Sequence, residues 1–409
     1  IEVYLSTTLA SPNKTYGDDK MTLTTEPVSA TIIENQDDLE PLAVVLAHHP
    51  VFAVDLEADG LHHYDEKLCL IQISTPEENY IVDALAMDDL GPLGRMLSDP
   101  SVEKVFHGCA YDVRLLAMQG ITIHNLFETQ VAAQLLGFES VGLASLLGDL
   151  MRIEVDKRFQ KADWSRRPLS HDMLEYAIRD THHLLQLRDI LANRLEGKGR
   201  MEWAREEFAL ACGCAPYVDP KSSLLYSFKG LGKFDRRGLA VLESLLKMRD
   251  HIARKRDVPH FKVVGNRLLS AIVEARPRNL EELSRVPDVR DWLIRRLGRQ
   301  VVAAVKAGMN VPESRLPLPP KRKGRSRTRS VERRVDEALK PVREAKSTEL
   351  GLDPGVLCPT QVMCEVARVD PRRPEDLEGI EGLRRWQAKV LGPDFIEALR
   401  RYGHHGHRG

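Results

Sequence analysis

VFAVDLE, at residues 51–57, is a short apolar run of β-favouring residues that ends in two carboxylates, and it largely determines the predicted fold. Side chains at positions i and i+2 share one face of a strand, so Asp55 and Glu57 should point the same way. Two converging carboxylates repel each other unless a cation lies between them. Taken alone, such a pair is common in proteins and equally fits two surface acids without a shared role.

The stretches around this run predict an α/β domain. Further β-favouring apolar runs occupy residues 68–74, 80–82 and 104–107. The connection between the first two strands contains Gly60 and is short enough for a hairpin. Apolar residues then recur at helical spacing over residues 111–118 and 131–136, and over one long helix from about His171 to Leu195. We therefore predict a mixed α/β fold with helices beside the sheet.

Two later segments carry further acidic residues. Asp112 lies on the predicted helix that follows Phe106 and His107, where a lone acid often only caps the helix. Tyr176 and Asp180 are four residues apart, so they share one helix face. The alternative for that pair is a packed tyrosine beside an exposed aspartate.

The order of these residues along the chain resembles the DEDD superfamily of 3′–5′ exonucleases in its tyrosine form. Glu175 stands five residues before Asp180, where the histidine form would have its histidine. A longer series is similar to ribonuclease D and to the catalytic exonuclease of the eukaryotic nuclear exosome, over roughly residues 28–200. That series comprises LIQIS at 70–74, VFHG at 105–108, Lys157, Asp163, Trp164, Arg167, Pro168, Leu169, Tyr176, Ala177 and Asp180.

This resemblance implies a ribonuclease H-like exonuclease domain that binds two divalent cations, Mg²⁺ or Mn²⁺, about 3.5–4 Å apart. Asp55, Glu57 and Asp180 would hold the cation that activates water. Asp55 would also reach the second cation, which Asp112 would support through water. Tyr176 would orient the attacking water. Ligands that are all oxygen atoms fit Mg²⁺ or Mn²⁺ better than zinc.

The resemblance also implies a set of substrate-binding residues. Leu56, Leu61, Phe106 and His107 would line the pocket for the terminal nucleotide. Trp164 and Arg167 would support the active-site loop. Core packing is the alternative for Trp164 and Phe106.

Past Glu202 the strand signals almost vanish, and helices punctuated by proline are predicted at residues 239–255, 266–275, 280–284 and 289–307. Residues 235–311 resemble the helical HRDC module that RecQ helicases share with ribonuclease D, and residues 335–402 are a candidate second HRDC-like domain. The motif of a P-loop is absent from the sequence, which excludes a helicase motor. The predicted organisation is a tail at 1–27, the exonuclease at 28–205, a linker at 206–234, HRDC at 235–311, a Pro-rich basic linker at 312–334, helices at 335–402 and a tail at 403–409.

Charge is distributed unevenly along the chain. Residues 1–200 hold 17 Lys/Arg and 32 Asp/Glu, whereas residues 201–409 hold 42 and 28. An acidic half joined to a basic half suggests carboxylate chemistry in one and polyanion binding in the other, although both could be merely solvated surfaces. A fragment ending near Glu207 is accordingly expected to cleave short RNA but to bind long RNA weakly. The basic run from Lys321 to Arg329 is a candidate phosphate-binding segment or a solvated spacer.

The predicted function is a 3′–5′ exoribonuclease that releases nucleoside monophosphates during tRNA or other structured RNA processing. The alternatives are a DNA 3′–5′ exonuclease and a catalytically silent RNA-binding scaffold, and the intact set of acids argues against the scaffold. RNA is the expected partner, and the helical C-terminal half could also bind proteins. Six scattered cysteines, no apolar run of about 20 residues and no signal peptide lead us to expect a cytoplasmic protein without membrane association.

Overall fold

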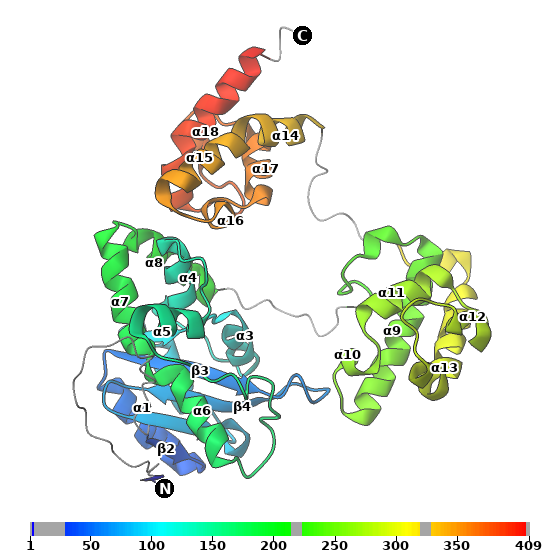
Figure 1. Ribbon diagram of the computed structural model, residues 1–409, viewed down its shortest axis with the longest axis horizontal. Helices are drawn as coiled ribbons and strands as arrows, with labels where there is room; N and C mark the ends of the chain where they lie inside the picture. Colours follow the sequence, from blue (N-terminus) through cyan, green and yellow to red (C-terminus); the bar gives the residue numbers. More distant parts are fainter. Residues whose placement is uncertain (1, 4–28, 214–222, 320–328, 406–409) are drawn as a thin grey trace, which may run out of the picture. The chain divides into compact units, whose positions relative to one another are not determined.

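The computed structural model describes residues 2–3, 29–213, 223–319 and 329–405 (Figure 1). The chain forms two compact units. Unit 1 consists of Ile1–Glu57, Leu68–Pro216 and Arg327–Gly409, and unit 2 of Ala58–Lys67 and Tyr217–Ser326. Most of the predicted N-terminal tail, the basic run at 321–327 and the last four residues lie outside the described residues.

Unit 1 is built on a mixed seven-stranded sheet with the order β1-β2-β5-β4-β3-β6-β7. Its strands are β1 (Glu2–Val3), β2 (Ala30–Ile33), β3 (Val51–Ala58), β4 (Leu68–Ser74), β5 (Asn79–Asp83), β6 (Glu103–Phe106) and β7 (Leu126–Glu128). β4 and β5 are antiparallel, whereas β2 and β5, β3 and β6, and β6 and β7 are parallel pairs. Every residue of β4 is buried, as expected for a strand covered on both faces. The predicted mixed α/β fold is confirmed.

Helices cover this sheet. In chain order they are α1 (Leu39–Ala47), α2 (Gly91–Ser98), α3 (Ala110–Met118), α4 (Thr129–Leu136), α5 (Leu143–Met151), α6 (His171–His182), α7 (Leu184–Gly197) and α8 (Met201–Cys212). The long helix predicted over residues 171–195 is in fact two, because the chain turns at His183. α6 packs on β4 and β5, whereas α7 packs on β6 and α4, and one straight helix could not serve both surfaces.

Unit 2 contains a helical bundle with its own apolar core. Its helices are α9 (Arg236–Arg256), α10 (His260–Val263), α11 (Asn266–Ala275), α12 (Leu280–Ser284) and α13 (Asp291–Met309). The short α10 was not predicted, and the other four lie close to their predicted bounds. α9 and α13 pack along each other (Figure 1). Gly308 makes this approach feasible, because a Cβ atom there would lie 2.4 Å from the Cα atom of Val241.

The last helices belong to unit 1 and share one apolar core with the exonuclease segment. They are α14 (Arg329–Arg334), a π-helical turn (Val335–Leu339), α15 (Lys340–Leu350), α16 (Pro354–Leu357), α17 (Thr360–Val369) and α18 (Arg385–His405). α18 packs against α8. The linker predicted from residue 206 therefore begins too early: α8 continues to Cys212, and Phe208 on it is buried against Phe127 with 4.8 Å between ring centres.

Polar contacts fix this second helical domain to α8. The Glu206 carboxylate accepts hydrogen bonds from the backbone N–H groups of Arg385 and Trp386, at 2.8 and 3.0 Å, and so caps the start of α18. The Glu207 carboxylate accepts one from the Trp386 indole N–H at 2.8 Å. The Trp386 ring also stacks on Trp203, with 4.8 Å between centres and 15° between planes. The contact therefore combines apolar packing with hydrogen bonds that fix the orientation of the two helices.

Candidate active site

The end of β3 supplies the first two acids. Phe52, Val54 and Leu56 point into the core and are at most 5% exposed, whereas Asp55 and Glu57 are partly exposed on the opposite face. The alternation expected from the sequence is thus present. It also means that the Leu56 side chain points away from the two carboxylates.

α6 brings the third acid and the tyrosine to the same place. Ser170 caps this helix by accepting a hydrogen bond from the Met173 N–H at 3.3 Å. Asp180 lies one turn beyond Tyr176, whose hydroxyl donates a hydrogen bond to the Asp180 carboxylate. The Tyr176 ring is held by Phe159 and Trp164, whose ring centres lie 5.8 and 6.1 Å away. Oxygen atoms of Asp55, Glu57 and Asp180 all lie within 4.8 Å of one another.

Asp112 completes the cluster from α3, where it is 6% exposed. The segment before this helix is tied down by Glu128 at the end of β7, which the sequence reasoning missed. The Glu128 carboxylate is 2% exposed and accepts hydrogen bonds from the N–H groups of Gly108, Gln130 and, at 2.6 Å, Val131. Glu128 therefore both starts α4 and fixes the backbone from which Asp112 projects. An acid directly after the apolar pair at 126–127 was the available signal.

Burial raises the pKa of all four carboxyl groups, and the charge of Asp55 adds to the rise in the other three. Burial raises the pKa of Asp55 to about 7, and burial and the Asp55 charge raise the pKa of Asp180 to about 8. Burial and the other three acids raise the pKa of Glu57 to about 10, and burial and Asp55 raise that of Asp112. In the part of the chain that the structure describes, no Lys, Arg or His forms an ion pair with any of the four. Such a cluster strongly favours a bound cation.

Arg167 anchors the loop in front of α6. Its guanidinium binds the Asp83 carboxylate through two hydrogen bonds of 2.5 and 2.6 Å and donates to the backbone oxygens of Trp164 and Cys69 at 2.7 and 3.2 Å. Such a fork-to-carboxylate pair is both strong and specific in geometry. Asp83, a second residue that the sequence reasoning missed, thus shares in positioning the loop that carries Trp164. The Arg167 donors are already engaged with protein groups.

The predicted substrate residues do not all come together. Phe106 and Trp164 are 0% and 1% exposed, so both are core residues here. The Nδ1 atom of His107 lies 2.9 Å from the Thr129 hydroxyl, and burial lowers the pKa of His107 to about 4, which keeps its ring neutral. Leu61 is 45% exposed and belongs to unit 2.

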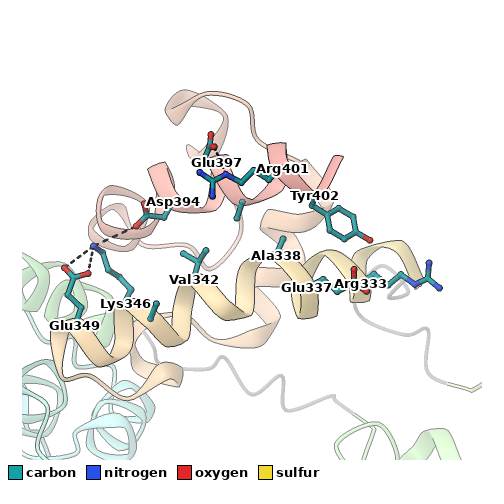
Figure 2. Close-up of a pocket in the computed structure, with 12 residues that line it drawn as sticks. Arg333, Glu337, Ala338, Val342, Lys346, Glu349, Asp394, Glu397, Arg401 and Tyr402 are labelled. Atoms are coloured by element: carbon teal, nitrogen blue, oxygen red, sulfur yellow. Dashed lines mark hydrogen bonds and ion pairs between the residues drawn. The ribbon is translucent and has the colours of Figure 1, made fainter. Parts of the chain in front are cut away.

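Unit 1 also contains a cavity of about 830 Å³ between α15 and α18 (Figure 2). Val342 and Ala338 point into it, and charged side chains surround it. Several of these charges pair with one another: Lys346 lies 2.9 Å from Glu349 and 3.9 Å from Asp394. Among the described residues, only Asp55, Glu57 and Asp180 bring oxygen atoms of three acids within 4.8 Å of one another, so the cluster on β3 is the better candidate for catalysis.

Comparison with known proteins supports this choice. A family model described as 3′–5′ exonuclease matches residues 30–196, and the HRDC domain model matches residues 238–305 and 332–399. The ribonuclease D of Granulibacter bethesdensis is 30% identical over 374 residues, which cover 90% of this chain and 92% of that protein.

Solved structures resemble the chain as well. The crystal structure of Escherichia coli RNase D matches with a TM-score of 0.69 and 24% identity, over 91% of this chain and 99% of that one. The catalytic core of RRP6 from Trypanosoma brucei matches with a TM-score of 0.56 and 29% identity, over 71% and 81%.

Fold and site together define a 3′–5′ exonuclease joined to HRDC domains. The chain belongs to the ribonuclease D family, and its activity is that of a 3′–5′ exoribonuclease. Among the described residues, no helix is long and apolar enough to cross a bilayer.

Proposed function

We propose that the chain hydrolyses the last phosphodiester bond at RNA 3′ ends with the help of two divalent cations and releases nucleoside monophosphates. The observation that carries this proposal is the cluster of Asp55, Glu57 and Asp180 oxygens within 4.8 Å of one another, with Asp112 and Tyr176 beside it. Four carboxylates without a protein cation have little structural use, because burial disfavours the ionised form of each and the charge of Asp55 disfavours it further in the other three.

The donor set fits Mg²⁺ or Mn²⁺. All candidate ligands are carboxylate oxygens, which these cations prefer, and a bound cation would offset the burial and repulsion that raise their pKa values. Asp55, Glu57 and Asp180 would hold one cation, and Asp55 and Asp112 the other. When bound, such cations stabilise charge on the phosphate and lower the pKa of water.

Tyr176 and Asp180 would position the water that attacks the phosphorus atom. Burial raises the pKa of Tyr176 well above 10, so its hydroxyl stays protonated and cannot act as a general base. It can donate a hydrogen bond, as it does to Asp180. The Phe159 and Trp164 rings hold the Tyr176 ring in place, so this donor is oriented before substrate binds.

Structured RNA, such as tRNA precursors, is the substrate that we propose. Support comes from the E. coli protein, which is described as an exoribonuclease involved in structured RNA processing. We further propose that the enzyme acts in a reducing compartment such as the cytoplasm. The described cysteines are all free thiols, and four of these five are buried.

The test compares matched RNA and DNA oligonucleotides of one sequence, each labelled at the 5′ end in one set and at the 3′ end in another. With Mg²⁺ or Mn²⁺, 3′-labelled RNA should release labelled mononucleotide at once, and 5′-labelled RNA should shorten stepwise. EDTA and Asp55→Asn should each stop cleavage. Faster cleavage of the DNA, internal cleavage, or full activity in EDTA would overturn the proposal.

A further inference from the structure

The positive charge of the C-terminal half is confined to one part of it. Residues 217–326 hold 25 Lys/Arg and 11 Asp/Glu, a balance of +14. Residues 327–409, which include the second helical domain, hold 16 and 14, a balance of only +2. Any surface of the helical half that attracts a polyanion should therefore lie in unit 2.

Within unit 2, one face of α13 collects cations and an aromatic ring. On a helix with 3.6 residues per turn, six of its positions fall within a sector of about 100°. They are Trp292, Arg295, Arg296, Arg299, Ala303 and Lys306, and together we call them the α13 stripe. All six are exposed, and the Trp292 side chain is 42% exposed. The stripe is about 21 Å long at 1.5 Å per residue.

The opposite face of α13 explains why the stripe points outward. Leu293, Leu297 and Val301 are at most 1% exposed and pack into the core of the bundle. Gly298 lies on that inner side, where a Cβ atom would meet the Leu280 side chain at 2.9 Å. α13 therefore cannot rotate without exposing its apolar residues, and the orientation of the stripe is determined by the fold.

The cations of the stripe have no carboxylate partner among the described residues, whereas most acids of the bundle are already paired. The pairs that Lys and Arg residues form within the described bundle are Lys233–Glu274, Arg237–Glu313, Lys247–Glu243, Arg267–Asp288, Arg276–Asp235 and Arg285–Glu281. The single acid of α13, Asp291, precedes the stripe. Four unpaired cations therefore repel one another along one face, which an anionic ligand would stabilise.

We propose that the α13 stripe binds a single-stranded segment of RNA, with Trp292 stacking on a base and the three arginines contacting phosphates. This rests on the proposed action on RNA and adds a binding surface separate from the carboxylate cluster. An exposed tryptophan in line with arginines suits a single strand, because unpaired bases offer their faces for stacking and their phosphates follow at regular intervals. An acidic protein would use the arginines but would leave the exposed indole without a matching role.

The test uses the full-length chain with Asp55→Asn, so that RNA is bound but not cut. One variant adds Arg295→Gln, Arg296→Gln and Arg299→Gln, and another adds Trp292→Ala. A matched control adds Lys233→Gln, Lys247→Gln and Arg285→Gln, which removes the same three charges from the same bundle. Each control residue is exposed and already paired, so its loss costs little stability. The probe is an oligouridylate of about 12 nucleotides, and a duplex RNA of equal length serves for comparison.

The triple arginine variant should bind the oligouridylate with a salt slope that is shallower by about 2, because single strands lose about 0.7 per phosphate contact. Trp292→Ala should weaken binding roughly 5- to 150-fold, as expected for one lost base stack, and should affect the duplex much less. The charge-matched control should change neither value. Equal effects of control and stripe variants would overturn the proposal, and so would a stripe variant that binds normally.

Cleavage separates this inference from the proposed function. With Asp55 restored, the stripe variants should cleave a trinucleotide at the wild-type rate, because so short a substrate needs only the active site. If the wild type itself fails to cleave RNA, the proposed function falls. If it cleaves RNA and the stripe variants bind the oligouridylate normally, only the inference about α13 falls. The inference about α13 would also fall if the stripe variants lost affinity for an acidic protein but kept their affinity for RNA.

Discussion

Replacing Trp386 by alanine should destabilise the exonuclease, although this residue belongs to the second helical domain. The Trp386 side chain is 4% exposed, stacks on Trp203 of α8, and donates to Glu207 at 2.8 Å. Removing a buried aromatic side chain costs about 3–5 kcal/mol when the surroundings cannot collapse into the cavity. Here collapse is restricted, because Glu206 holds the start of α18 through two backbone N–H groups.

This cost can be converted into a melting temperature. For domains of 150–250 residues, 1 kcal/mol corresponds to about 2–4 °C, so Trp386→Ala should lower the midpoint of unit 1 by roughly 6–20 °C. The assay is thermal unfolding followed by circular dichroism, with cleavage of a short unstructured RNA measured at each temperature. Trp292→Ala is the matched control, because its ring is 42% exposed and its loss should change the midpoint by little.

Activity on the short RNA should disappear at the lowered midpoint of the Trp386 variant, because α8 and the sheet share the affected core. The reasoning would be refuted if Trp386→Ala and Trp292→Ala had equal midpoints. It would also be refuted if a chain consisting of residues 29–213 unfolded at the same temperature as the full-length protein.

The remaining predictions concern the carboxylate cluster. Asp55→Asn should reduce turnover to less than a tenth, because an amide carries no negative charge to hold the cation. In EDTA, the melting temperature of the wild type should fall as the pH rises from about 4 to 7. Burial raises the pKa of Asp55 to about 7 in the folded state, so the folded protein keeps a proton that the unfolded chain releases. The fall should be smaller in Asp55→Asn. Tyr176→Phe should slow turnover on the order of 10²-fold at saturating Mn²⁺, and wild-type turnover would leave Tyr176 with a packing role only. Glu128→Gln should weaken Mn²⁺ binding, measured by calorimetry, whereas Glu128→Asp should restore part of it; equal affinity in all three proteins would exclude a positioning role toward Asp112.

Local periodicity was sufficient to predict the core of the site. The i, i+2 spacing of Asp55 and Glu57 places both on one strand face, and the i, i+4 spacing of Tyr176 and Asp180 places both on one helix face. These rules depend only on backbone geometry, so the structure had little freedom to differ from them. The helices predicted at 266–275 and 280–284 coincide with α11 and α12 for the same reason.

Residues whose role depends on distant parts of the chain could not be predicted in this way. Glu128 acts on Gly108, twenty residues earlier, and Asp83 pairs with Arg167 across 84 residues. The break at His183 arises because α6 and α7 pack on different surfaces, not from any helix-breaking residue. By resemblance, Phe106 was placed in the nucleotide pocket and Trp164 in support of the active-site loop, and the burial of both side chains supports the alternative of core packing.

The uneven charge of the chain therefore does not divide it into a catalytic N-terminal half and a polyanion-binding C-terminal half. The second helical domain is close to neutral at +2, and it packs on the exonuclease through shared apolar residues, so it behaves as part of the catalytic unit. A fragment ending near Glu207 would end inside α8, before Phe208, which is 5% exposed, and would expose the core that α18 covers. Contrary to the expectation from charge, such a fragment should not be an active exonuclease. Most of the excess belongs instead to a bundle with a core of its own, because residues 223–319 hold 20 Lys/Arg and 10 Asp/Glu. If both proposals hold, changes of charge there should alter attraction to RNA without altering the carboxylate cluster, because the two sites depend on separate cores.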